Sequence, residues 1–581
     1  MPQLFRRNAT RVLSAALAAV LGAALLAGCS LIGGGSGGSG TAAPTRDCSP
    51  APGPQRVTSS YVRGAYYFGD ASPINFWSSD LSGAAKTFAQ MQADGFNTVA
   101  LVIPWGHFQL GVQPPRYDMA AFCSLRQLVS IAGHHHLQVI LRLSYQDMDP
   151  RDQMAGSARV SRLFSDPAVR RSWLDYIGKV RQQVSRYPNV RGAFLSWEDY
   201  WFLVNEAQSA HGPARLRLAR ATGYQGWLSH HYSLSQVSSI YGARFSSWSA
   251  VPTPAYHTPA FRLFYRYFDW FLENRLFEPA ERRFPGLSLE ARVDADPIYQ
   301  GSKIIGGYSH SATWHLPGTS VTGLYFNPYM GVSVSGSSET ASQGLQGLQS
   351  VLSTMKSKAE GRPLFIYEYQ FVSNAPQISG TPTLAPDQIP AFIEQSGSLL
   401  RQYTVGYAVW TYRDFPVTVV FNPSFSLGTE GWATTGSVSV AHPRHASSYL
   451  ELPGGGSAAQ SIPGGRNAYP GSGRMTLSLR AAAGGKASAL RVKVGASDRH
   501  TFHVVPGWHT YSYTFSIPRS GLANYNLTLQ SSAPTNLTAV KLYSFVQLGD
   551  VHSLSGAAEP GLAALRNLNS QLANAPGPPT K

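Results

Sequence analysis

Two glutamates lie where short apolar runs end, and their side chains could act together in acid–base chemistry. Glu198 follows the run VRGAFLSW and Glu368 follows the run PLFIY, 170 residues further along the chain. A facing pair of carboxyl groups can break a glycosidic bond, because one protonates the leaving oxygen while the other attacks or stabilises the anomeric carbon. Residues so far apart become neighbours in a parallel barrel, where the carboxyl ends of the strands meet at one rim.

The segments that would carry these glutamates alternate between strand-like and helix-like patterns from Val62 to about Tyr412. Their short, nearly continuous apolar runs are typical of parallel strands with both faces buried. Because no Gly-rich phosphate loop follows the first strand, eight such strands favour an α/β fold of the (β/α)8 TIM barrel type over an open, doubly wound sheet. Glu198 would then end the fourth strand and Glu368 the seventh. The strands are expected at 62–68, 97–103, 138–144, 190–197, 288–293, 321–326, 363–367 and 405–411.

One connection in this pattern, residues 199–287, is far too long for a plain loop. It holds two aromatic stretches with helical spacing, and we expect it to shape a cleft or to add outer helices. The barrel domain would span residues 59–416.

The composition changes after Phe415 to short alternating runs rich in Gly, Ser and Thr, with turn signals about every ten residues. This pattern predicts an all-β sandwich at 417–553. The tail, 554–581, is expected to form a short helix at 556–572 and then to be disordered.

The segments around Glu198, Glu368 and Trp410 resemble clan A of the glycoside hydrolases, which are retaining enzymes built on (β/α)8 barrels. The resemblance covers about residues 60–415. Within the clan, the chain is distantly similar to family 42 β-galactosidases, through the segment YSLSQVSSIYGARFSSW, or to cellulase-like hydrolases. The resemblance implies Glu198 as acid/base, Glu368 as nucleophile and Trp410 as an aromatic floor beneath the sugar. The clan usually has Asn before the acid/base, whereas this chain has Trp197. Either another residue holds the sugar 2-hydroxyl, or the sugar differs at that carbon.

The run NPSFSLGTEGW at the start of the second domain looks like the start of jelly-roll carbohydrate-binding modules. Trp432 and Trp508 could stack on sugar rings there, although a core position is the preferred interpretation for both.

Several other side chains near the expected strand ends could bind sugar hydroxyls. Trp197, Tyr200 and Trp201 could raise the pKa of Glu198 by excluding water, and Asp199 could tune it. Tyr325 or Tyr329 could donate a hydrogen bond to Glu368. The predicted substrate-binding set is Trp410, Trp105, His107, Arg142, Asn327, Tyr329 and Trp197.

Glu206 is the alternative acid, because it belongs to an Asn205–Glu206 pair. It lies beyond the strand end, so we interpret it as part of the insertion.

No cofactor and no metal are predicted. The consecutive histidines His134–His136 point in different directions and are interpreted as a helix end. The DAD run at 294–296 lacks the further spaced acids of a calcium loop.

The first 28 residues read as a lipoprotein signal peptide. Arg6, Arg7 and Arg11 precede an apolar run that ends in LAGC, so Cys29 would carry the lipid. A transmembrane anchor is the weaker alternative, because the run has about 15 residues against the roughly 20 that span a bilayer. Residues 29–58 would be a flexible tether, and the protein would be exported and anchored to the membrane at the cell surface or in the periplasm.

The formal charge of +16 falls to about +13 without the three leader arginines, and charged residues make up only 13% of the chain. No Lys/Arg run resembles a nucleic-acid-binding stripe. The excess of Lys and Arg over Asp and Glu is compatible with an ordinary exported protein or with attraction to acidic polysaccharide or envelope polymers. Export permits a Cys48–Cys123 disulfide, but Cys123 falls on an apolar helical face, so a buried free thiol is expected.

These features together predict a retaining hydrolase of a β-linked poly- or oligosaccharide. Two alternatives remain open: a non-catalytic glycan-binding surface lipoprotein, and a transglycosylase that remodels an envelope or exopolysaccharide.

Overall fold

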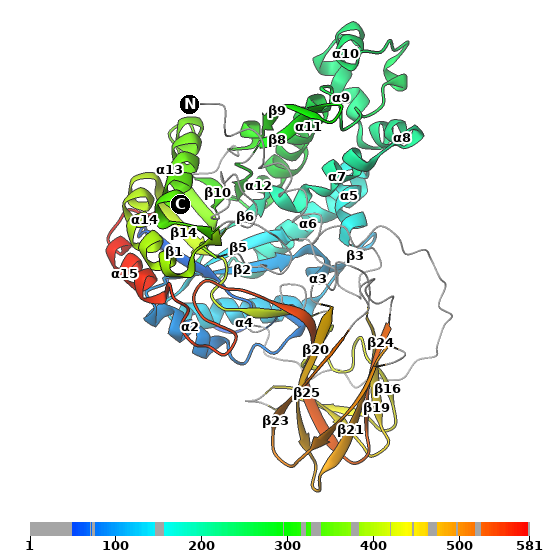
Figure 1. The fold of residues 1–581 in the computed structure, drawn as a ribbon, viewed down its shortest axis with the longest axis vertical. Coiled ribbons are helices and arrows are strands. Elements are labelled where there is room, and N and C mark those ends of the chain that lie inside the picture. The colour runs from blue at the N-terminus through cyan, green and yellow to red at the C-terminus, as the bar shows by residue number, and fades with distance from the viewer. Residues whose placement is uncertain are drawn as a thin grey trace.

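The computed structural model describes residues 49–578, except 70, 72–75, 146–155, 294, 315–320, 327–337, 373–382, 419, 444–446, 463–472, 496–497 and 517–524. A barrel surrounded by helices forms one part of the molecule and a β-sandwich forms another (Figure 1). The leader, Cys29 and most of the tether lie outside the described residues. Within the described part, no helix is both long enough and apolar enough to cross a membrane.

Eight parallel strands close into a barrel, as the sequence predicts. Closure occurs where β1 pairs with β14, with Val62 opposite Gly406. All residues of β2 are buried, as expected for a strand covered on both faces. In chain order the strands are β1 (Val62–Tyr66), β2 (Thr98–Pro104), β5 (Gln138–Tyr145), β6 (Val190–Ser196), β7 (Ser288–Ala291), β10 (Thr322–Phe326), β12 (Leu364–Tyr369) and β14 (Thr404–Val409).

The helices around the barrel begin at side chains that satisfy their first backbone N–H groups. Asp166 accepts hydrogen bonds from Ala168 N and Val169 N at the start of α6, which has Pro167 in its first turn. Thr340 and Gln343 form a capping box at the start of α13. The main outer helices are α2 (Ala84–Ala93), α4 (Met119–His134), α6 (Pro167–Val184), α13 (Ala341–Lys358) and α14 (Ile389–Tyr403).

Helix α4 ends at His134, so the interpretation of the three histidines as a helix end is confirmed. The expectation of a free thiol at Cys123 is wrong, because this cysteine is disulfide-bonded. A side chain on an apolar helical face can be buried equally well as a thiol or as half of a disulfide, so the pattern alone does not distinguish the two. The chain's other cysteines, Cys29 and Cys48, lie outside the described residues.

The long connection after β6 is helical. Helix α11 (Phe261–Phe271) buries eight of its eleven residues and continues through a π-helical segment, Leu272–Phe277, into α12 (Glu278–Arg283). Figure 1 shows α8 to α10 at the end of the molecule opposite the sandwich. The remaining insertion helices are α7 (Phe202–Ser209), α8 (Pro213–Thr222), α9 (Tyr224–His231) and α10 (Leu234–Tyr241).

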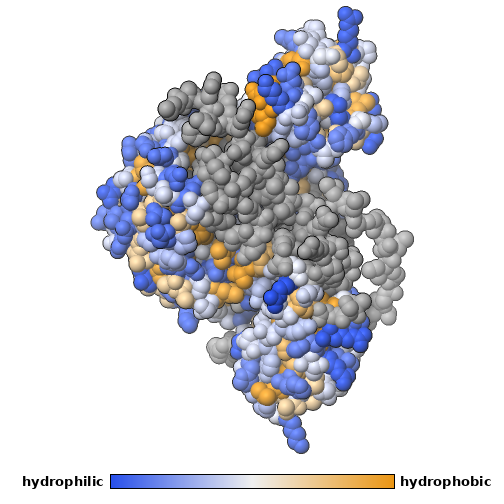
Figure 2. All heavy atoms as spheres, in the orientation of Figure 1, coloured by the Kyte–Doolittle hydropathy of each residue, from blue (hydrophilic) through white to orange (hydrophobic). Residues whose placement is uncertain are grey.

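The second domain consists of two antiparallel sheets, which confirms the predicted sandwich. Alternate residues of facing strands, among them Leu477, Leu490 and Leu527, form a separate core between the sheets. One sheet has the order β17-β18-β25-β20-β23, with β15 also paired to β25. The other sheet has the order β16-β19-β24-β21-β22. Hydrophilic residues cover much of the sandwich on the face shown in Figure 2. The strands are β15 (Phe415–Thr418), β16 (Ala433–Thr435), β17 (Ser439–Ala441), β18 (Tyr449–Leu452), β19 (Ser457–Ile462), β20 (Arg474–Ala483), β21 (Ser488–Val494), β22 (Asp498–Val504), β23 (His509–Ser516), β24 (Tyr525–Ser531) and β25 (Thr535–Gln547).

After β25 the chain returns to the barrel. Asp550 accepts hydrogen bonds from Phe371 N and Val372 N, just after β12. Helix α15 (Leu562–Leu572) packs on α14, and Gly577 N donates to Ser59 O. The tail predicted as a short helix followed by disorder is therefore ordered to residue 578 and forms part of the barrel's outer layer.

Candidate active site

Arg142, on the third barrel strand, connects four of the strand ends that form the rim. It is 2% exposed. Its Nη1 donates to Glu368 Oε1, while its Nη2 and Nε lie 3.3 and 3.4 Å from the carboxylate oxygens of Asp199. The guanidinium carbon lies 4.9 Å from the ring centroid of Tyr145 and 5.7 Å from that of Trp410. This buried cation therefore joins the ends of strands three, four, seven and eight.

Glu368 lies on β12, near the carboxyl end of the seventh strand, and is 8% exposed. Burial raises the pKa of this carboxyl group, Arg142 opposes that rise, and Asp199 adds to it. The net direction is upward, so the ionised form depends on the ion pair with Arg142.

Glu198 lies in the 3₁₀ turn Trp197–Tyr200 that directly follows β6, the fourth strand. Its side chain is half-buried, whereas Trp197, Asp199 and Tyr200 in the same turn are buried. The two glutamates singled out in the sequence thus occupy the carboxyl ends of strands four and seven, and Glu198 is the more open of the two.

A third glutamate, Glu290, belongs to the same rim and was missed in the sequence analysis. It lies on β7 opposite Ser196 of β6, whose Oγ donates to Glu290 Oε1 over 2.7 Å. Its Oε2 is buried without a hydrogen-bond partner in the described part of the chain. Burial and the neighbouring Glu368 raise the pKa of Glu290 well above its ordinary value, although Arg142 opposes them. The available signal was a carboxylate between two apolar residues, Leu289 and Ala291, in the short predicted strand SLEARV.

The charges of this cluster do not balance if all its carboxyl groups are ionised. Asp199, Glu290 and Glu368 are buried around one cation, Arg142, which would leave two uncompensated negative charges. Neighbouring carboxyl groups in this situation retain a proton. Arg142 contacts Asp199 and Glu368 directly, whereas Glu290, among the described residues, accepts only from the neutral hydroxyl of Ser196. Glu290 is therefore the group best placed to hold that proton.

Trp410 follows β14, the eighth strand, beside Arg142. It is 6% exposed and packs edge-on against Tyr66 and Phe68, with ring centroids 4.6 and 5.4 Å away. These contacts fix the indole at the rim, where the sequence places an aromatic floor for a sugar.

Trp197, the residue that replaces the clan's Asn, packs into the insertion. Its ring centroid lies 5.2 Å from that of Phe268 on α11 and 4.6 Å from that of His310. The guanidinium carbon of Arg292 lies 5.1 Å from the Trp197 ring and 4.6 Å from the Trp201 ring. The structure thus shows Trp197 anchoring the turn that carries Glu198.

Behind this anchor, His310 lies between two carboxylates. Its Nδ1 is 2.8 Å from Asp269 Oδ1 and its Nε2 is 2.8 Å from Asp296 Oδ2. Burial opposes the charged imidazolium, but the two aspartates outweigh it and raise the pKa of His310 to about 9. Asp296 also pairs with Arg292 over 2.8 Å, so the network connects α11 with the arginine that holds Trp197 and Trp201.

The other predicted sugar-binding residues lie in different surroundings. Trp105 and His107 are buried on α3 (Trp105–Phe108); Trp105 Nε1 donates to Gln109 Oε1, and its ring lies 4.9 Å from Arg159 Cζ. Asn327 and Tyr329 lie outside the described residues. Glu206, the alternative acid, lies on insertion helix α7.

Among the described residues, no group of three or more His, Cys, Asp or Glu side chains has an arrangement that could hold a metal ion. Asp296 of the DAD run is engaged by Arg292 and His310, and Asp294 lies outside the described residues.

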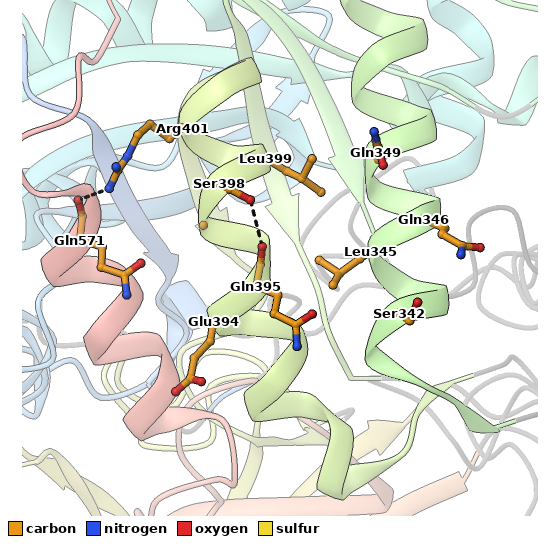
Figure 3. Close-up of a pocket in the computed structure, with 11 residues that line it drawn as sticks. Ser342, Leu345, Gln346, Gln349, Glu394, Gln395, Ser398, Leu399, Arg401 and Gln571 are labelled. Carbon is orange, nitrogen blue, oxygen red and sulfur yellow. Dashed lines mark hydrogen bonds between the residues drawn. The ribbon is translucent and has the colours of Figure 1, made fainter.

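A separate groove lies on the outer helices rather than at the rim. Figure 3 shows it between α13 and α14, with Gln571 of α15 at one side and Arg401 donating to the Gln571 carbonyl oxygen. Its lining residues are Ser342, Leu345, Gln346, Gln349, Glu394, Gln395, Gly397, Ser398, Leu399, Arg401 and Gln571.

No protein-family model matches the chain, and no curated protein matches it in sequence. Among solved structures, the chain is similar to GH5_18 from Streptomyces cattleya in complex with GlcNAc, with 16% identity over 62% of this chain and 72% of that one and a TM-score of 0.38. The exo-β-1,4-mannosidase Op5Man5 from Opitutaceae bacterium strain TAV5 has 16% identity over 62% and 56%, with a TM-score of 0.36. A family 16 carbohydrate-binding module has 14% identity over 21% and 98%, with a TM-score of 0.18. Glycoside hydrolases are thus among the structures found, as the resemblance predicted.

Proposed function

We propose that this chain is a retaining glycosidase that hydrolyses a β-linked poly- or oligosaccharide. One observation carries the proposal: Glu198 and Glu368 end strands four and seven of one barrel, and a buried arginine pairs with Glu368. A half-buried acid and a buried, cation-paired carboxylate are the two groups that this reaction needs.

In the first step, the Glu198 carboxyl group protonates the glycosidic oxygen while a Glu368 carboxylate oxygen attacks the anomeric carbon. The bond between that carbon and the leaving oxygen breaks, and the sugar is held as an ester of Glu368. In the second step, the Glu198 carboxylate takes a proton from water as the water oxygen attacks the same carbon. The ester bond breaks, and Glu368 leaves as a carboxylate.

Arg142 and Glu290 support this division of roles. Arg142 stabilises the ionised form of Glu368, which burial alone would disfavour. A neutral Glu290 adds no further anion to Asp199 and Glu368 and keeps its hydrogen bond with Ser196. The nucleophile can then be ionised at neutral pH although three acids surround one cation.

The same charges bear on the sugar at the reacting subsite. Asp199 and Glu368 outnumber Arg142 even when Glu290 is neutral and Glu198 carries the proton that it donates. A carboxylate on the substrate next to Glu368 would add repulsion in a site of low dielectric. We therefore expect a neutral sugar, rather than a uronic acid, at the bond that is cleaved.

For its location, we propose an exported lipoprotein, processed after residue 28 and anchored through Cys29. The basic, apolar and LAGC segments of the leader support this proposal. Radiolabelled palmitate incorporation tests it: the wild-type chain should be labelled and the Cys29→Ser variant should not.

The test of the activity is a panel of neutral β-linked glycans incubated with the mature chain. Wild type should release reducing ends from at least one glycan, and Glu198→Gln and Glu368→Gln should each lose at least about 10²-fold in rate. Glu394→Gln is the matched control, because Glu394 is exposed on α14, away from the rim. Glu206→Gln tests the alternative acid and should remain active.

Two results would contradict the proposal. Glycan binding without turnover would support the non-catalytic alternative, and full activity of Glu368→Gln would exclude the assigned nucleophile. Transfer to added sugar acceptors in preference to water would identify the same site as a transglycosylase.

A further inference from the structure

The positive charge of the chain is concentrated in the sandwich. Residues 417–547 contain ten Lys and Arg residues but only three Asp and Glu residues, a net charge of +7. The mature chain as a whole carries about +13, so roughly a quarter of its length supplies about half of its excess charge. Such asymmetry between domains indicates an electrostatic role for the more basic one.

Three of these cations lie on one outer face of the sandwich. Strands β21 and β22 pair so that Lys493 is directly opposite Arg499, and Arg491 is opposite Thr501. The alternate residues of the same strands, such as Val492, point into the core. Arg491, Lys493 and Arg499 therefore point outward, and all three are exposed.

We call these three residues the basic face, and none of the described side chains of the domain compensates its charges. Like charges directly opposite each other on neighbouring strands destabilise a sheet. In the part of the chain that the structure describes, none of the three side chains makes an ion pair or a hydrogen bond with another residue. An anion bound from outside would relieve this repulsion.

The residues beside the basic face are small and polar. On the neighbouring strand β24, Gln530 is opposite Arg491 and Thr528 is opposite Lys493. Outward residues of one strand recur every two positions, about 7 Å apart, and neighbouring strands are about 4.8 Å apart. Cations, hydroxyl groups and an amide thus alternate on the scale of a sugar unit.

We propose that the basic face binds an anionic polysaccharide. Its carboxylate or sulfate groups would pair with Arg491, Lys493 and Arg499, and its hydroxyl groups would bond with Thr501, Thr528 and Gln530. This inference does not depend on the glycosidase proposal. The two domains would therefore bind sugars of different charge. The sandwich would bind an anionic polymer, whereas the active site at the barrel rim would cleave a bond next to a neutral sugar.

The chemistry of the face favours a polysaccharide over other polyanions. Single-stranded nucleic acids are held by aromatic side chains on which bases stack. Membrane surfaces are bound by apolar side chains that enter the lipid, or by larger clusters of about four to eight Lys and Arg residues. The outward residues of β21 and β22 at this face, Ala489, Arg491, Lys493, Arg499, Thr501 and His503, include no Phe, Tyr, Trp or large aliphatic residue.

Affinity electrophoresis of the mature chain in gels containing alginate tests the proposal. The variant Arg491→Gln/Lys493→Gln/Arg499→Gln should bind alginate about tenfold more weakly or worse, because electrostatic attraction of this kind changes association by at least that factor. It should keep the unfolding temperature of wild type or exceed it, because like-charge repulsion is removed. The matched control Lys86→Gln/Lys356→Gln/Lys358→Gln removes the same charge from exposed positions on the barrel helices α2 and α13 and should bind as wild type.

Four outcomes would overturn the inference: equal binding by wild type and the basic-face variant, equal losses in both triple variants, equal retardation by neutral dextran, or tighter binding of a single-stranded oligonucleotide than of alginate. Turnover of a neutral oligosaccharide, measured in parallel, should be unchanged in the basic-face variant. A failure of glycan hydrolysis in all variants would therefore count against the proposed activity and not against the basic face.

Discussion

Arg142 and Glu368 form a buried ion pair across the mouth of the barrel, although 226 positions separate them in the sequence. The same guanidinium group contacts Asp199, next to the candidate acid Glu198. One cation therefore fixes the position of the candidate nucleophile and opposes the effect of burial on its pKa.

Replacing Arg142 with Met should shift the pH dependence of activity. Without the cation, the pKa of Glu368 rises further, so the acidic limb of the kcat/KM profile should move to higher pH. Arg142→Lys restores the charge but not the planar fork, and should recover only part of the activity. Removing one partner of a buried pair costs about 3–5 kcal/mol, so unfolding curves must accompany the kinetics. An unchanged acidic limb in a folded Arg142→Met variant would contradict the role assigned to Arg142.

Replacing Glu290 with Gln should have little effect on activity at neutral pH. Gln resembles a protonated carboxyl group in size and charge, so kcat/KM should stay within about threefold of wild type, less than about 0.7 kcal/mol of barrier. The infrared spectrum of wild type minus that of the variant should show the carbonyl band of one protonated carboxylic acid, because the protonated acids present in both, such as Glu198, cancel. If Glu290 were ionised, its loss would instead lower the pKa of Glu368 and move the acidic limb to lower pH.

The Asp269–His310–Asp296 network should make stability depend on pH above neutrality. The pKa of His310 rises from 6.5 to about 9 on folding, so its contribution is fully present below pH 6.5 and is lost as the pH rises through 9. Asp269→Asn should therefore destabilise the fold by about 3–5 kcal/mol at pH 6, and by less at pH 9.5. Asp175→Asn removes an exposed aspartate and should have no comparable effect. Equal losses at both pH values would contradict a charged His310.

Removing the tail after residue 553 should destabilise the barrel although no strand is lost. Helix α15 buries Leu562, Leu565, Leu568 and Leu572, each contributing about 1.5–3 kcal/mol. Their sum is comparable with the whole stability of a typical domain. Thermal unfolding should show a large loss for this truncation and none for one that ends at residue 578; the same unfolding temperature in both would show that α15 is dispensable.

The barrel was predictable because its strands are buried on both faces and so appear as apolar runs at regular intervals. Counting those runs placed Glu198 and Glu368 on strands four and seven without any knowledge of side-chain contacts. The sandwich was predictable for a related reason, since its strands alternate and its turns are rich in Gly.

The features that could not be predicted depend on tertiary contacts. Glu290 lies between Leu289 and Ala291 in the sequence, and nothing there indicates a role for its carboxyl group. That role depends on Ser196 and Glu368, which become its neighbours only in the folded barrel. The position of Trp197 next to Glu198 in the sequence predicts a place in the sugar site. In the structure its ring packs against Phe268, whose position depends on the fold of the insertion. The helix in the tail was predictable from its leucines at helical spacing, but its packing on α14 was not, because that contact joins segments far apart in the sequence.

The most direct test of the central claim is to trap the glycosyl-enzyme. The mature chain would be incubated with a 2-deoxy-2-fluoro glycoside of the sugar found active in the panel, digested, and mapped by mass spectrometry. Wild type should carry one added sugar on the peptide that contains Glu368, Glu368→Gln should carry no label, and the product should have the same anomeric configuration as the substrate. A label on Glu198 or Glu290, or an inverted product without any label, would contradict a retaining mechanism through Glu368.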